Sequence, residues 1–157
     1  MFKLVDKLFI GNEQDCFFAE RTNWAVIHAC KHLCHQQAVG YKGNLPDTHP
    51  NYLTLERGNH LFLNMIDPHI PLFKQKLFDD SLTFIQKHIE KRNVLIHCNL
   101  GFSRAPSIAL IWLAKRTEII SDDSFQAALN EFREMYPLYQ PGRGIVTYLS
   151  TMWDKIN

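Results

Sequence analysis

Cys98 and Arg104 are the residues whose types and spacing are best suited to chemistry, and five residues lie between them. A cysteine thiolate is a nucleophile at neutral pH, and a guanidinium fork grips two oxygens of a phosphate at once. An apolar run ends at His97, and Pro106 stands where a helix accepts proline, in its first turn. The stretch therefore predicts a strand, a tight loop around Gly101 and a helix start. Such a loop aims backbone N–H groups and the helix dipole at one bound dianion.

The alternative for Cys98 is a structural role, because a buried cysteine after an apolar strand is usually a small core residue. Core packing does not explain a histidine directly before the cysteine, a glycine three residues after it or an arginine six residues after it. We therefore expect Cys98 to be a nucleophile, held as the thiolate by the N–H donors and the guanidinium. The expected phosphate-binding residues are Asn99, Leu100, Gly101, Phe102, Ser103 and Arg104.

Asp67 is the candidate for the proton donor that a departing alkoxide or phenolate needs. It follows the apolar segment 61–66 and precedes two nearby prolines, so it should lie in a loop just past a strand end. Loops at that edge of an open α/β sheet face ligands. The alternative is an aspartate that only stabilises its own turn. Asp79 and Asp80 are rivals, but they fall inside a predicted helix and should face partly outward.

A family resemblance rests on the motif His97-Cys98-x-x-Gly101-x-Ser103-Arg104. It resembles the signature of the cysteine-dependent protein tyrosine phosphatases, and it is most similar to that of the dual-specificity branch. The resemblance extends over most of the chain. It implies a dual-specificity protein phosphatase that hydrolyses phosphotyrosine, phosphoserine or phosphothreonine through a phosphocysteine intermediate. The implied partner is a phosphorylated protein or peptide, and the implied chemistry requires no metal or cofactor.

The resemblance also implies a role for each residue. Cys98 attacks phosphorus, while Arg104 and the loop N–H groups hold the phosphoryl oxygens. Asp67 lies 31 residues ahead of Cys98, as the family's general-acid loop does, and would protonate the leaving oxygen and later act as base. His97 is expected to orient the loop and to favour the thiolate. Ala105 departs from the pattern, because most relatives carry there a Ser or Thr whose hydroxyl stabilises the sulfur as a leaving thiolate.

Two other functions stay open. Phe102 follows Gly101 much as in RNA triphosphatase variants of the fold, which indicates the same chemistry on a non-protein phosphate such as an RNA 5′ end. The second is a weakly active, phosphate-binding pseudophosphatase, although Cys98, Arg104 and Asp67 are all present. The interior of the loop contains no lysine and no second arginine, so an inositol-lipid phosphatase is not indicated.

Length and composition predict one domain over residues 1–157, because 46% hydrophobic residues can form a real core. The formal net charge of +1 gives no reason to expect a nucleic-acid or membrane surface. The longest apolar run is far shorter than a membrane span, and the N-terminal residues show no export signal. We expect a soluble, cytoplasmic protein, and the oligomeric state stays open.

The pattern of apolar residues predicts an α/β fold with a central, mostly parallel twisted sheet and helices on both faces. Expected strands lie near 3–10, 24–30, 52–57, 60–66 and 94–97, and expected helices near 13–20, 72–91, 105–116, 122–136 and 143–154. Leu72 begins the buried stripe of the second helix, and Ser121 is a candidate N-cap of the fourth. Residues 31–51 give no clear pattern.

The chain has three other cysteines, namely Cys16, Cys30 and Cys34, and three histidines share the segment 28–35 with two of them. This spacing matches no recognised zinc pattern, and the chain has no second pair of closely spaced cysteines. Residues 24–30 are moreover expected to form a strand, which sends alternate side chains to opposite faces. We therefore expect no metal, and a redox role for these cysteines stays open.

Overall fold

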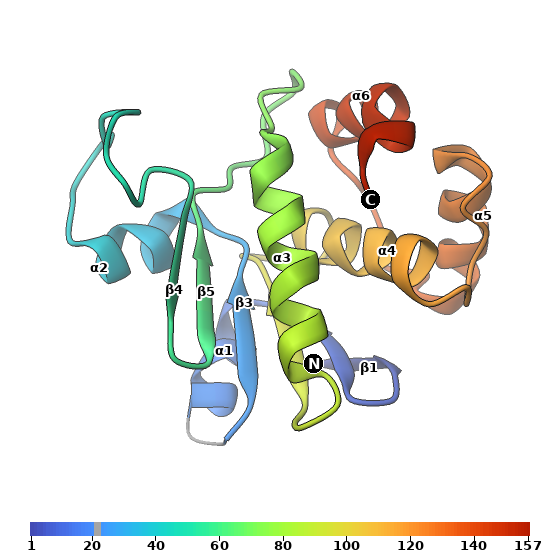
Figure 1. The fold of residues 1–157 in the computed structure, drawn as a ribbon, viewed down its shortest axis with the longest axis horizontal. Helices are drawn as coiled ribbons and strands as arrows, with labels where there is room; N and C mark the ends of the chain where they lie inside the picture. Colours follow the sequence, from blue (N-terminus) through green and yellow to red (C-terminus); the bar gives the residue numbers. More distant parts are fainter. Residues whose placement is uncertain (21–22) are drawn as a thin grey trace.

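The computed structural model describes residues 1–20 and 23–157, and its strands form one six-stranded sheet. Along the sheet the strands follow the order β1-β2-β6-β3-β5-β4, and Figure 1 shows β4, β5 and β3 side by side at one end of it. The four central strands are parallel, and each edge strand is antiparallel to its neighbour. The strands are β1 (Phe2–Val5), β2 (Leu8–Gly11), β3 (Ala25–His28), β4 (Thr54–Arg57), β5 (His60–Leu63) and β6 (Val94–His97).

Helices cover both faces of this sheet. On one face α3 and α4 pack against the strands, α5 packs against α4, and α6 packs against α5 (Figure 1). On the other face α1 packs against β2, β3 and β6. The helices are α1 (Glu13–Glu20), α2 (Gln36–Val39), α3 (Gln75–His88), α4 (Arg104–Arg116), α5 (Phe125–Met135) and α6 (Arg143–Met152), with short helical turns η1 (Lys31–His35) and η2 (Trp153–Lys155). No helix in the described ranges is both long enough and apolar enough to cross a membrane.

Side chains of β6 alternate between the two faces of the sheet, and both faces are buried. Val94 and Ile96 belong to the large core beneath α3 to α6, whereas Leu95 joins Val26 and Ala19 in a small cluster beneath α1. A strand with helices on both sides has no solvent face, so its apolar residues run on without interruption. The expected α/β fold class, with its mostly parallel sheet, is confirmed.

Three details of the expected elements were wrong. The segment 3–10 is a hairpin rather than one strand, because the chain turns at Asp6 and at Lys7, whose φ is 58°. Leu72 is 60% exposed and lies ahead of α3, which begins at Gln75. The cap of α5 is Ser124, whose Oγ accepts the N–H of residue 127, whereas the Oγ of Ser121 accepts the N–H of residue 123 within the preceding turn.

Candidate active site

Cys98 follows β6 directly, at the edge where the parallel strands end and α4 begins. Its side chain is almost fully buried, and its N–H donates to the carbonyl oxygen of Gly11 over 3.4 Å. Residues 99–103 then form a loop that leads into α4 at Arg104. The carboxyl edge of parallel strands is where α/β proteins bind ligands, and the N-terminus of α4 adds a positive dipole end there.

The backbone of this loop turns its carbonyl groups away from the site. Each of four carbonyl oxygens accepts a hydrogen bond from a donor outside the loop. In contrast, the N–H groups of residues 99–103 donate to no acceptor within the described part of the chain. A run of uncommitted N–H groups at a helix N-terminus forms an anion-binding cradle. The carbonyl pairs are Asn99 with Glu13 N–H, Gly101 with Tyr136 O–H, Phe102 with Gln140 N–H, and Ser103 with Ser107 N–H.

Gly101 is required at the centre of the loop for two reasons. Its φ of +79° lies in the left-handed region, which favours glycine. A Cβ atom at this position would also lie 3.0 Å from the carbonyl oxygen of Gly11. Leu100 and Phe102 on either side turn outward, with 69% and 38% of their surface exposed, so their backbone is the part that faces the cradle.

The guanidinium of Arg104 is held from one side by protein oxygens. Nη1 donates to the carbonyl oxygens of Ala29 at 3.2 Å and Met65 at 3.0 Å, and Nη2 donates to Oδ1 of Asn99 at 2.7 Å. Nε is buried and has no hydrogen-bond partner among the described residues. Because a guanidinium has five N–H donors, this arrangement orients the group and leaves the Nε side free for an oxyanion.

Asp67 lies in the loop after β5, two residues beyond the carbonyl that Arg104 binds, and its side chain is exposed. Its carboxylate lies against Gly142 so closely that a Cβ atom there would collide with it. The N–H of Gly142 in turn donates to Oγ of Ser103 over 2.9 Å. The fold therefore brings Asp67 next to a segment that contacts the cysteine loop.

The rival carboxylates lie elsewhere. Asp80 on α3 accepts hydrogen bonds from the Thr54 hydroxyl and from Nζ of Lys76. Asp79 is partly exposed on the same helix, as expected. Of the three candidates, Asp67 is the one that lies against Gly142, the residue whose N–H binds Ser103 of the cysteine loop.

His97 is fully buried and does not point at the dianion site. Its Nε2 lies 2.8 Å from Nδ1 of His28, and Nε2 of His28 lies 3.0 Å from Nδ1 of His60. Burial lowers the pKa of His28 to about 4, so this ring is neutral at pH 7. The supporting role of His97 stays a prediction.

Ala105 is fully buried in the first turn of α4, and the two nearest serines in sequence have other partners. The hydroxyl of Ser107 donates to the carbonyl oxygen of Ser103, and its Oγ lies 2.7 Å from the Tyr139 hydroxyl. Oγ of Ser103 accepts the N–H of Gly142. No hydrogen bond joins either serine to the Cys98 sulfur among the described residues.

The segment between α5 and α6 braces the loop, and sequence reasoning missed this. Tyr136, Gln140 and Gly142 each donate a hydrogen bond to the cysteine loop from more than 30 residues away. The proline and glycine residues of 137–144 indicate a loop, but they do not indicate what the loop contacts. Arg143 from this segment is exposed.

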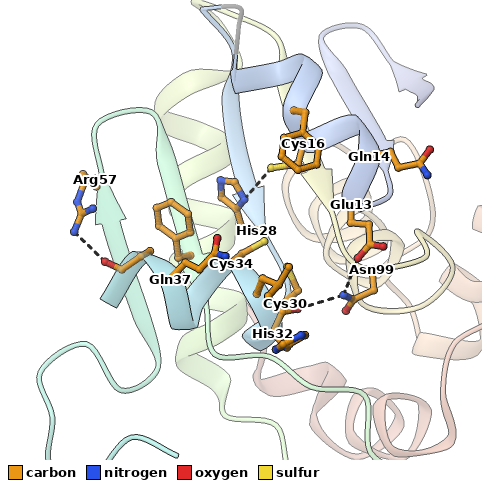
Figure 2. Close-up of a pocket in the computed structure, with 14 residues that line it drawn as sticks. Glu13, Gln14, Cys16, His28, Cys30, His32, Cys34, Gln37, Arg57 and Asn99 are labelled. Atoms are coloured by element: carbon orange, nitrogen blue, oxygen red, sulfur yellow. Dashed lines mark hydrogen bonds between the residues drawn. The ribbon is translucent and has the colours of Figure 1, made fainter. Parts of the chain in front are cut away.

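A cleft of about 480 Å³ lies beside the cysteine loop, and Asn99 contributes to its wall. Figure 2 shows Asn99 between Glu13 and the backbone of His32, with both hydrogen bonds drawn. The cleft is lined further by cysteine and histidine side chains from α1, β3 and η1, whereas Cys98 is not part of the lining.

Known proteins similar to this chain are dual-specificity phosphatases. No protein-family model matches the sequence. The chain is 32% identical to the dual specificity protein phosphatase YVH1 of Plasmodium falciparum over 113 residues, which are 68% of this chain and 18% of that protein. It is 25% identical to human dual specificity protein phosphatase 16 over 98% of this chain and 21% of that protein. The chain thus spans about a fifth of the length of these relatives.

Solved structures share the fold at low sequence identity. A leucine-rich repeat and phosphatase domain protein of Entamoeba histolytica superposes with a TM-score of 0.66 at 17% identity, covering 98% of this chain and 90% of that one. Human DUSP28 gives 0.66 at 12% identity, covering 97% and 91%. The human tyrosine phosphatase-like serine/threonine/tyrosine-interacting protein gives 0.63 at 19% identity, covering 98% and 94%. With the cysteine loop, its arginine and the curated relatives taken together, the chain belongs to the dual-specificity branch of the cysteine-dependent protein tyrosine phosphatases.

Proposed function

We propose that the chain is a phosphomonoesterase that hydrolyses phosphotyrosine, phosphoserine or phosphothreonine in proteins through a phosphocysteine. The observation that supports this most directly is the state of Arg104. Three protein oxygens hold its guanidinium in place, yet its buried Nε has no partner in the described residues. The buried Nε–H and the uncommitted N–H groups of the loop need several acceptor oxygens in one ligand. A phosphoryl group provides such oxygens.

In the first step, the thiolate of Cys98 forms a bond to phosphorus as the bond to the leaving oxygen breaks in line. The loop N–H groups and Arg104 stabilise the charge on the three equatorial oxygens. Asp67 gives its proton to the leaving oxygen, so that the product departs as a neutral alcohol or phenol.

In the second step, water displaces the sulfur from phosphorus, and Cys98 leaves as the thiolate. Asp67, now a carboxylate, accepts the proton from the attacking water. Inorganic phosphate is released, and the enzyme regains the protonated Asp67 and the thiolate. Residues 1–157 would act as one catalytic domain for this cycle, and the free thiols suit a reducing compartment such as the cytoplasm.

Replacement of the nucleophile tests this proposal. Cys98→Ser should lose all but a few per cent of turnover on an aryl phosphate and on phosphopeptides. Vanadate or phosphate should still bind, because the cradle is backbone and Arg104, and this binding also shows that the variant is folded. Substantial turnover by Cys98→Ser would exclude the phosphocysteine route.

A substrate panel separates the other two functions. Competition between phosphopeptides and triphosphorylated RNA should favour the peptides, because the net charge of +1 offers little attraction for RNA. Preference for the RNA would show that the substrate is a nucleic acid rather than a protein. Binding of phosphopeptides without turnover of any phosphate ester would identify a pseudophosphatase.

A further inference from the structure

Five sulfur- and nitrogen-bearing side chains converge beside the active site. Cys16 comes from α1, His28 from β3, Cys30 from the residues after β3, Cys34 from η1 and His97 from the end of β6. Figure 2 shows the side chains of the first four around one space in the wall of the cleft. The mechanism proposed above uses none of the three cysteines.

The distances within this cluster suit a shared metal ion. Sγ of Cys30, Sγ of Cys34 and one ring nitrogen of His97 all lie within 4.8 Å of one another. Cys16, His28 and His97 form a second set of three whose donor atoms also lie within 4.8 Å of one another, so His97 is shared by both sets. In a tetrahedral zinc site, the bond lengths to sulfur and nitrogen place a sulfur and a nitrogen ligand about 3.6 Å apart.

The thiol of Cys34 lies close to the other members of the cluster. It interacts with the thiols of both Cys16 and Cys30 and with the rings of His28 and His97. Cys16, Cys30 and both rings are buried, whereas Cys34 is partly exposed in the lining of the cleft. The cluster is therefore closed on most sides but keeps a path by which an ion can enter.

The hydrogen bonding of the histidines leaves one nitrogen uncommitted. Nδ1 of His28 lies 2.8 Å from Nε2 of His97 and 3.5 Å from Sγ of Cys16, and the two rings can share a hydrogen bond in either direction. Binding of a metal through Nδ1 of His97 requires the tautomer with the proton on Nε2, which then donates to Nδ1 of His28. Nδ1 of His97 is buried and has no hydrogen-bond partner in the described structure. Metal-binding histidines commonly donate their other N–H to a neighbouring acceptor, as His97 does to His28 in this tautomer.

We propose that Cys16, Cys30, Cys34 and His97 bind one zinc ion, with His28 orienting the ring of His97. Three thiolates and one imidazole form a donor set that selects zinc among common divalent ions. Binding releases the thiol protons to solvent, and no oxidation is involved. The close spacing of Cys30 and Cys34 does not by itself indicate this site, because the other two proposed ligands come from α1 and from the end of β6.

The site would connect three segments around the active centre. It joins α1 and η1 to the end of β6, one residue before Cys98. Zinc binds the folded protein, so loading should raise the melting temperature in proportion to the logarithm of the free zinc concentration. This consequence does not depend on turnover of any phosphate ester.

The test is zinc binding by the full chain under reducing conditions. The metal-free protein should take up about one equivalent of zinc in competition with a chromophoric chelator. Cobalt in place of zinc should give thiolate-to-metal charge-transfer absorption and the visible bands of a tetrahedral site. Cys34→Ser and Cys16→Ser should each weaken zinc binding by about 100-fold or more, since even the loss of an outer partner costs 10- to 100-fold.

Cys98→Ser is the matched control, because it changes the one cysteine outside the cluster and should leave zinc affinity unchanged. Three results would overturn the proposal. These are no stoichiometric zinc uptake by the reduced wild type, cobalt spectra without thiolate absorption, or loss of binding in Cys98→Ser with retention in Cys16→Ser and Cys34→Ser. The wild-type measurements decide the matter even if one variant does not fold. Failure of phosphatase activity with intact zinc binding would affect only the proposed function.

Discussion

Nη1 of Arg104 donates a hydrogen bond to the carbonyl oxygen of Met65 over 3.0 Å, and Asp67 follows two residues later. The side chain of Arg104 thus contributes to the phosphate cradle and also binds the backbone at the start of the loop that carries the candidate acid. The relative position of nucleophile and acid depends on this contact. Changes at either end should therefore affect catalysis and stability together.

Arg104→Lys should reduce kcat/KM on phosphopeptides by about 100- to 1,000-fold, the usual effect of removing a donor to the transition state. Lysine keeps the charge but not the planar fork, so the carbonyls of Ala29 and Met65 lose their shared donor. The melting temperature should fall as well. The control is Arg143→Lys, because Arg143 is exposed at the start of α6. Equal activity of Arg104→Lys and Arg143→Lys would show that the planar guanidinium of Arg104 has no role in catalysis.

Asp67→Asn should reduce kcat/KM by about 100- to 10,000-fold on esters with poor leaving groups, because the first step on these depends on general acid catalysis. For phosphate esters of acidic phenols kcat/KM should fall much less, whereas kcat should still fall because Asp67 is also the base of the second step. The wild-type pH profile of kcat/KM should be bell-shaped, since the first step needs a protonated Asp67 beside a thiolate. The variant should lack the fall on the alkaline side. Asp79→Asn is the control, and a loss there with a normal Asp67→Asn would assign the acid to α3.

Gly142→Ala should lower turnover of poor leaving groups, because the added methyl group would displace the Asp67 carboxylate. The backbone N–H that binds Ser103 is retained in this variant. If the effect acts through Asp67, the double variant with Asp67→Asn should be little worse than Asp67→Asn alone. Fully additive losses in this double-mutant cycle would show that Gly142 affects turnover independently of Asp67.

Ala105→Ser should accelerate steady-state turnover by about 10- to 100-fold, since a hydrogen bond to a charged group contributes about 1.5–3 kcal/mol. The wild type should show a burst of product, because expulsion of the sulfur lacks this hydroxyl and limits the rate. Ala109→Ser, one turn further along α4 and equally buried, controls for the added oxygen. Linear wild-type kinetics with no gain in Ala105→Ser would place the slow step before the intermediate.

The parts of the site that were predictable from the sequence lie close together along the chain. Cys98, Gly101 and Arg104 share one short segment whose strand, loop and helix are set by local residue types. The strand end before Asp67 and the prolines after it indicate the loop in which it lies, and its role as the acid stays a prediction. The α5 cap was placed three residues early because Ser121 and Ser124 both precede the helix, and only the hydrogen bond to residue 127 distinguishes them.

The remaining parts depend on contacts between distant segments. Tyr136 reaches Gly101 across 35 residues, and Gly142 reaches Ser103 across 39. No local pattern encodes such pairs, since each side chain is compatible with many surroundings. The cluster around Cys34 was missed for the same reason: a strand sends neighbouring side chains apart, but α1, η1 and β6 supply the other members.

The most direct test of the central claim is rapid quenching of wild-type protein in the burst phase, followed by mass spectrometry of the peptide that contains Cys98. The mechanism predicts that this peptide gains one phosphoryl group on sulfur. It also predicts that the group disappears as steady-state turnover depletes the substrate, and that Asp67→Asn accumulates more of it when the leaving group is good. Product release with Cys98 unmodified at every quench time would contradict the account.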